Sequence, residues 1–164
     1  MKIAIISDTH NNLHNVQAVR LELLTHELTT IIHCGDLTEA DILDYFGDFN
    51  LFCVYGNGDY PPEVEERIKW LNPENKAGES LEFSLAGKTF FVTHGHIRGL
   101  VDKAIKSQRY DFVLLGHTHR FKDVTIGTTR VINPGSLGGK KVEERSFVIL
   151  DLETGNLERH FLTC

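Results

Sequence analysis

Apolar runs and helix-like periodicities alternate along the first third of the chain. Ile3–Ile6 is a β-branched run, and the apolar residues of Asn12–Leu28 recur at helical spacing. Ile31-Ile32 and Leu51–Tyr55 are two further apolar runs, and Glu39–Phe46 between them is predicted as a short helix. Strands that alternate with helices in this way indicate right-handed crossovers and a parallel sheet.

The pattern changes after about Gly78, where apolar and polar residues begin to alternate with a period of two. The remaining segments predict a β-hairpin, a short helix, a buried strand and two further hairpins, at 81–93, 99–107, 112–115, 124–132 and 147–161. Helices therefore cover parallel strands early in the chain, and antiparallel pairs dominate late. The whole pattern predicts an α/β fold with a pair of mixed sheets sandwiched by helices.

The length of 164 residues suits one domain with a full core, and we expect residues 1–164 to form it. No apolar stretch has the length of a membrane span, and the first apolar run is too short for a signal peptide. Cys34 and Cys53 lie in apolar runs and are expected to be buried free thiols. Together these features indicate a cytoplasmic protein.

The net charge of −6 argues against a broad basic face that binds long nucleic acid. The net charge does not exclude a small phosphate-bearing substrate, because a bound metal can supply positive charge locally. The sequence does not fix the oligomeric state, and a homo-oligomer stays open.

Five apolar runs end in the same way, with a small residue followed by Asp, Asn or His. The carboxyl ends of strands in an open α/β sheet face a common crevice. We therefore expect these side chains to converge: Asp8, His10, Asp36, Asn57, His94, His117 and His119. Alone, each is more often a packed residue or a cap than a ligand, but five such strand ends in one register are not independent. The glycines are expected to provide sharp backbone turns, and His117 and His119 to point the same way along an extended segment.

Imidazole, carboxylate and amide oxygen are donors for divalent metal ions. Seven ligands are too many for one catalytic ion, so they predict two ions that share a bridging carboxylate. We take manganese as the cofactor, with nickel, zinc, iron and magnesium as alternatives. Three histidines outside the pattern, His14, His26 and His160, are interpreted as surface residues, and His33 is assigned no role.

The motifs SDTH at 7–10, GD at 35–36, GN at 56–57, HGH at 94–96 and GHTH at 116–119 resemble those of the calcineurin-like metallophosphoesterases. Their order and spacing are similar to those of the small single-domain bacterial and archaeal phosphodiesterases, and the similarity continues to NPGS at 133–136. The resemblance implies a four-layer α/β/β/α sandwich with a dinuclear metal centre. It implies that one ion is held by Asp8, His10, Asp36 and His119. The other would be held by Asp36, Asn57, His94 and His117, with Asp36 as the bridge.

We therefore predict a hydrolase, a dinuclear metal-dependent phosphoric diester hydrolase that acts on a small or nucleotide-like phosphodiester. A hydroxide bridging the two cations would attack phosphorus, because the pKa of water on such ions falls toward roughly 7. Many relatives have a histidine after the motif asparagine, proposed to protonate the leaving group, where this chain has Gly58. His96 is the candidate catalytic residue in its place, and a hydrogen bond to a ligand or phosphate is its alternative role. The alternative functions are a phosphomonoesterase or nuclease at the same site, or a non-catalytic protein-interaction scaffold of the same fold.

Overall fold

The computed structural model describes residues 1–139 and 144–162, and it forms eleven strands and four helices in them. The strands of the first half are β1 (Lys2–Ile6), β2 (Thr30–His33), β3 (Asn50–Val54), β4 (Lys76–Gly78), β5 (Ser80–Leu85) and β6 (Lys88–Thr93). Those of the second half are β7 (Phe112–Leu114), β8 (Lys122–Ile126), β9 (Thr129–Asn133), β10 (Arg145–Asp151) and β11 (Leu157–Leu162). The helices are α1 (Leu13–Thr25), the 3₁₀ helix η1 (Ala40–Phe46), α2 (Pro61–Leu71) and α3 (Leu100–Ser107). None of these described helices is long and apolar enough to cross a bilayer.

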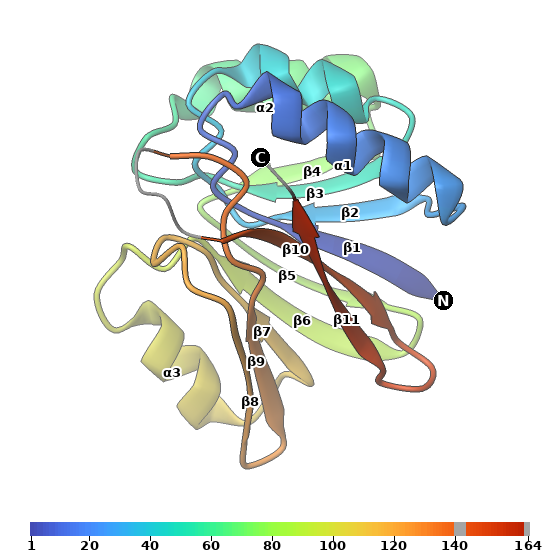
Figure 1. The fold of residues 1–164 in the computed structure, drawn as a ribbon. Coiled ribbons are helices and arrows are strands. Elements are labelled where there is room, and N and C mark those ends of the chain that lie inside the picture. The colour runs from blue at the N-terminus through green and yellow to red at the C-terminus, as the bar shows by residue number, and fades with distance from the viewer. Residues whose placement is uncertain (140–143, 163–164) are drawn as a thin grey trace.

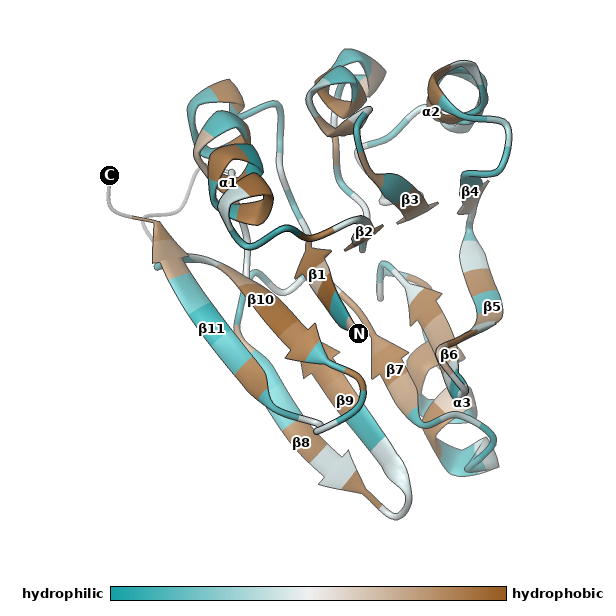
Figure 2. Ribbon diagram, turned by 90° about the vertical axis from the view of Figure 1, so that its right-hand side faces the viewer, coloured by the Kyte–Doolittle hydropathy of each residue, from teal (hydrophilic) through white to brown (hydrophobic). Residues whose placement is uncertain are grey.

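The elements form four layers, which Figure 2 shows from the side. A six-stranded sheet of order β11-β10-β1-β2-β3-β4 faces a five-stranded sheet of order β5-β6-β7-β9-β8. Helices α1, η1 and α2 cover the outer face of the first sheet, and α3 covers the outer face of the second (Figure 1). Each sheet contains both parallel and antiparallel pairs. The predicted α/β/β/α sandwich of two mixed sheets is therefore confirmed.

Apolar side chains fill the three spaces between these layers. Strand β1 contributes to two of them, because successive residues of a strand point to opposite faces. Ala4 and Ile6 pack toward the helices, and Ile3 and Ile5 pack toward the second sheet. This explains why β1 is an unbroken apolar run rather than an alternating one. The third and smallest apolar cluster lies between the second sheet and α3.

A row of stacked phenylalanine rings crosses the space between the sheets. Phe52 lies 4.1 Å from Phe83, Phe83 lies 5.2 Å from Phe90, and Phe90 lies 5.0 Å from Phe112, between ring centroids. The four rings come from β3, β5, β6 and β7, so the row connects strands of both sheets. Phe90 is fully buried within it.

The sequence pattern did not predict α2 or β4. Helix α2 buries only Val64 and Ile68, so its apolar stripe is too narrow to stand out among its charged residues. Strand β4 has three residues, too few for any periodicity. The hairpin of β10 and β11 was expected among the late antiparallel strands, and it joins the first sheet, because β10 pairs with β1.

We expect Phe90→Ala to lower the free energy of unfolding by about 3–5 kcal/mol, because it removes a buried ring and leaves a cavity. Urea denaturation of both proteins with metal removed measures this difference. The matched control is Leu21→Ala on α1, where the side chain is 68% exposed and the change should stay within about 0.5 kcal/mol. Equal losses for the two variants would contradict the assignment of Phe90 to the core.

Candidate metal centre

The loops after β1, β2, β6 and β7 are joined by backbone hydrogen bonds at one end of the sandwich. The Asp8 N–H donates to the Gly35 carbonyl at 2.9 Å, and the Gly116 N–H donates to the His94 carbonyl at 3.0 Å. A third bond joins the loop after β9, because the Gly138 N–H donates to the Asp8 carbonyl at 2.7 Å. The strand ends thus meet, as the sequence pattern predicted.

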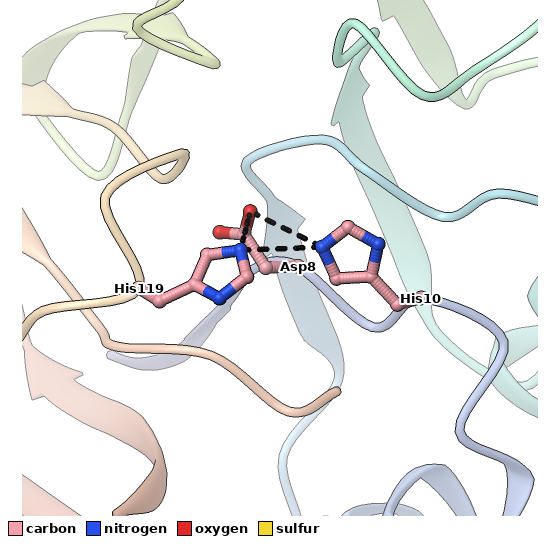
Figure 3. Close-up of side chains that lie close together, drawn as sticks. All are labelled: Asp8, His10 and His119. Carbon is pink, nitrogen blue, oxygen red and sulfur yellow. Dashed lines mark hydrogen bonds and ion pairs between the residues drawn. The ribbon is translucent and has the colours of Figure 1, made fainter. Parts of the chain in front are cut away.

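Asp8, His10 and His119 form the first cluster of candidate ligands (Figure 3). His119 Nε2 lies 3.1 Å from Asp8 Oδ1 and 3.2 Å from His10 Nε2, and His10 Nε2 lies 3.8 Å from Asp8 Oδ1. Donors that each lie about 2.0–2.2 Å from one tetrahedral ion are roughly 3.3 Å apart. The spacing of these three donor atoms therefore fits a single metal ion.

The buried carboxylate of Asp8 has one oxygen held by the protein and one left for a metal. Oδ2 accepts hydrogen bonds from the Ser7 hydroxyl at 2.6 Å and from the His117 N–H at 3.0 Å. Oδ1 is buried and accepts no hydrogen bond from any described residue. A buried anionic oxygen without a donor is strongly unfavourable, so this atom fits a cation.

Asp8, Asp36 and His94 form the second cluster, in which all three residues are buried. His94 Nδ1 lies 2.7 Å from the carbonyl oxygen of Cys34, so Nδ1 carries a proton and donates it there. Nε2 lies 3.4 Å from Asp36 Oδ1 and has no hydrogen-bond partner among the described residues. A metal-bound histidine commonly donates its other ring N–H in this way, which fixes Nε2 as the ligand atom.

Asp36 lies between the two clusters. Its Oδ1 faces His94 at 3.4 Å, and its Oδ2 faces His10 Nε2 at 3.6 Å. Burial raises the pKa of Asp36, but the neighbouring His94 ring and a hydrogen bond from the Gly58 N–H outweigh this effect and hold the pKa below its ordinary value. Asp36 is therefore an ionised carboxylate whose two oxygens point toward different imidazoles.

The remaining candidates lie around this centre at greater distance. The His117 ring lies 5.0 Å from His94 and is exposed, and burial together with His94 lowers its pKa, which favours the neutral, metal-binding form. The His96 ring lies 5.4 Å from His94 and 6.3 Å from His117, between ring centroids. Asn57 is exposed in the loop after β3.

The prediction that His117 and His119 lie in an extended segment is wrong. Strand β7 ends at Leu114, and both histidines follow in a bend with positive φ angles of 66° and 58°. Their rings therefore approach different partners, His94 for His117 and His10 for His119. Alternation of side chains applies only to an extended strand.

The role of the glycines was predicted correctly for only some of them. Gly35 and Gly95 have positive φ and turn the chain, whereas Gly56 and Gly116 do not. A Cβ at Gly56 would lie 2.0 Å from Asp36 Oδ1, and one at Gly116 would lie 1.9 Å from Ser7 Oγ. These two positions require glycine because polar ligand-bearing loops pass directly against them.

Residues 1–155 match the model of the calcineurin-like phosphoesterase superfamily domain. The chain belongs to this superfamily. It is 36% identical over 157 residues to the phosphodiesterase MJ0936 of Methanocaldococcus jannaschii, covering 93% of this chain and 94% of that protein. The solved structure of an archaeal phosphodiesterase superposes with a TM-score of 0.93 at 33% identity, covering 99% of this chain and all of the other.

The same fold also occurs in Vps29 of Entamoeba histolytica, solved as a complex with zinc. That structure superposes with a TM-score of 0.65 at 16% identity and covers 99% of this chain and 98% of that one. Membership of the calcineurin-like superfamily implies divalent metal ions, and the two Asp/His clusters contain the donors to hold them.

Two residues that support the superfamily site were missed at the sequence level. The carboxylate of Asp59 accepts the N–H groups of Gly56 and of three successive residues, at 2.7–2.9 Å: Asp36, Leu37 and Thr38. It thereby joins the loops after β2 and β3. A signal existed in the run Gly56-Asn57-Gly58-Asp59, but an Asp in a turn is most often a local cap.

His33 was assigned no role, and the structure gives it one. It is buried, its Nδ1 accepts from the Gly35 N–H at 3.1 Å, and its Nε2 lies 3.2 Å from the Thr9 hydroxyl. The Gly35 bond requires an unprotonated Nδ1, so the proton is on Nε2 and the ring is neutral. Burial lowers the pKa of His33 to about 4, although the carboxylate of Asp59 acts in the opposite direction.

We expect His33 to make stability fall with acid. Between its unfolded pKa of about 6.5 and its folded pKa of about 4, the unfolded chain binds a proton that the folded chain excludes. The free energy of unfolding should therefore drop by about 2–3 kcal/mol from about pH 7 to about pH 4.5 through this residue. Urea denaturation of chelator-treated wild type and His33→Gln at each pH measures this contribution. The other titrating groups are present in both proteins, so their effect cancels in the difference. Parallel pH profiles would show that His33 is not held neutral.

Proposed function

We propose that this chain is a metal-dependent phosphodiesterase in which Asp36 bridges two divalent cations. The observation that carries this proposal is the position of Asp36, whose two oxygens face the imidazoles of His10 and His94 in separate clusters. The similarity to phosphodiesterases over nearly the whole chain supports the same activity.

The loops after β2 and β7 would each contribute to both ions. One ion would be held by Asp8, His10, Asp36 and His119, and the other by Asp36, Asn57, His94 and His117. Manganese is the proposed ion, because this mixture of imidazole, carboxylate and amide oxygen suits it, as it also suits nickel, zinc, iron and magnesium.

The chain's own residues prepare this site for an anionic substrate. Two divalent ions, when bound, contribute about +4 of charge, polarise the phosphate and lower the pKa of a water molecule toward neutrality. Asp8 and Asp36 return only −2, so the site is positive although the chain carries −6. A phosphodiester carries one negative charge, and attack on it meets less repulsion than attack on a dianionic monoester. We therefore propose a small or nucleotide-like diester as substrate.

His96 is the proposed source of the leaving-group proton. Gly58 does not have a positive φ, but its N–H donates to Asp36 Oδ1, and a Cβ there would lie 3.2 Å from that oxygen. A side chain at this position would press on Asp36, which would have to move by a few tenths of an ångström. His96 is half-buried near His94 and His117, and its Nδ1 has no hydrogen-bond partner among the described residues. A ring N–H of His96 would donate a proton to the departing oxygen.

A role as a protein-interaction scaffold has less support. The likeness to Vps29 is a likeness of fold. A scaffold has no need of two buried carboxylates among imidazoles, which are unfavourable without a cation. A phosphomonoesterase or nuclease would use the same donors, and a substrate panel separates these activities. We further infer a single domain over residues 1–164 and a cytoplasmic location, the latter from the buried free thiols of Cys34 and Cys53.

The first test is metal content. We expect two manganese ions per catalytic centre after reconstitution, and we expect Asp36→Asn to lose at least one ion and about 10²-fold or more in diester turnover, because the bridge serves both ions. Elemental analysis and a diesterase assay measure the two effects. The matched control is Asp102→Asn, an exposed carboxylate on α3, which should behave as wild type. One ion or fewer in the saturated wild type would refute the dinuclear site.

The second test is the dependence of rate on the leaving group. A positioned general acid is typically worth 10²–10⁴-fold for poor leaving groups, such as a ribose alkoxide, and little for nitrophenolate. If His96 is that acid, wild type should show a shallow dependence of rate on leaving-group pKa, and His96→Gln should show a steep one. The difference in rate between wild type and His96→Gln should be smallest on nitrophenyl diesters. A uniform loss on all substrates would instead assign His96 to binding or structure.

A further inference from the structure

A second group of metal-ligating side chains lies outside the catalytic centre. One donor atom from each of Glu22, His26 and His160 lies within 4.8 Å of the other two. His26 and His160 were interpreted from the sequence as surface residues, which holds for exposed His26. His160 is a different case, because its side chain is 17% exposed and it faces Glu22.

The local structure explains why these three residues meet. Glu22 and His26 are four residues apart at the end of α1, so they lie on one face of the helix. His160 is opposite Phe147 in the pairing of β11 with β10, and the two rings are stacked at 5.0 Å with an angle of 23°. Phe147 is fully buried, so it fixes the plane of the imidazole.

The two ring nitrogens of His160 face different carboxylates. Nδ1 is in hydrogen-bond contact with Glu22 Oε1, so these two donor atoms already point toward each other, and an ion bound by Glu22 and His26 would take Nδ1 as its third ligand atom. Nε2 is buried and has no hydrogen-bond partner among the described residues. Glu158 Oε2 lies 3.8 Å from that nitrogen, so the proton that stays on Nε2 when Nδ1 binds a metal would face a carboxylate.

We propose that Glu22, His26 and His160 bind one zinc-type divalent cation that fastens strand β11 to helix α1. Two imidazoles and a carboxylate are a donor set that zinc takes. In this role the ion is structural: it ties the edge strand of the first sheet to the helix that covers it. Figures 1 and 2 show β11 at that edge, on the side of the sheet where α1 lies.

This site is separate from the catalytic centre. Helix α1 begins at Leu13, directly after the loop that carries His10, and rises 1.5 Å per residue. Glu22 and His26 therefore lie roughly 13–20 Å along the helix from that loop. An ion at this site cannot share a ligand with the catalytic ions, and the two sites can be measured independently.

The contrasting explanation is a plain ion pair between Glu22 and a protonated His160, with His26 as a neighbouring edge-on ring at 5.6 Å. The two explanations differ in what His26 does. In the metal site His26 is a ligand, and its loss removes the ion. In the ion pair His26 is not one of the two partners, and its loss leaves the metal content unchanged.

The experiment compares zinc content by equilibrium dialysis of chelator-stripped wild type, His26→Gln and His14→Gln. His14 is an exposed histidine on the first turn of the same helix and belongs to neither group of ligands. We expect wild type and His14→Gln to bind one zinc more per chain than His26→Gln. Diesterase activity with manganese should be equal in all three, since none of the changes touches the catalytic centre.

Because only the difference in zinc content between variants is used, the result does not depend on how many ions the catalytic centre holds. Glu22→Gln provides a second measurement and should also lose one zinc. Circular dichroism checks that each variant is folded. Equal zinc content in wild type, His26→Gln and Glu22→Gln would overturn the proposal, whatever the diesterase assay shows.

Discussion

Two carboxylates buried side by side impose the main constraint on this molecule. Asp8 and Asp36 belong to one cluster with His94, with donor atoms within 4.8 Å of one another. Like charges at that distance repel strongly where water is excluded. The surrounding loops therefore direct N–H groups at them, from His117 to Asp8 and from Gly58 to Asp36. These N–H donors compensate only part of the negative charge. A pair of cations can balance the remainder.

The same loops store backbone strain in order to aim their ligands. Five of the seven candidate ligands have positive φ: Asp8, His10, Asp36, His117 and His119. Asp and His tolerate this conformation better than most residues, yet each such position costs of order 1 kcal/mol or more. The hydrogen bonds of Asp59 and His33 offset part of that cost, because they hold the turns on both sides of Asp36. The strands that carry these loops offset the remaining conformational cost.

Much of this arrangement could be predicted from the sequence, and the failures share a physical cause. Strand ends that repeat a small residue and a polar donor indicated convergence, because parallel strands present their carboxyl ends together. The segment with His117 and His119 was wrongly taken as extended, because it lies beyond the end of β7, where the alternation of a strand no longer applies. Gly56 and Gly116 were attributed to turns, but they are small because neighbouring loops touch them. Contacts between segments distant in sequence, including those of Asp59 and His160, leave no local pattern. Helix α2 was not predicted because it buries only two residues, too few to give a clear helical periodicity.

The pairing of β1 also sets the order in which the protein can assemble during synthesis. One edge of β1 pairs with β2, which follows soon after, but the other pairs with β10, where Lys2 is opposite Asp151. At roughly 5–20 residues per second, about 7–30 s separate the synthesis of these two partners. During that time β1, apolar from Ile3 to Ile6, has an open edge, which is a template for pairing with other chains. This edge of β1 stays open until β10, in about the last eighth of the chain, has been made.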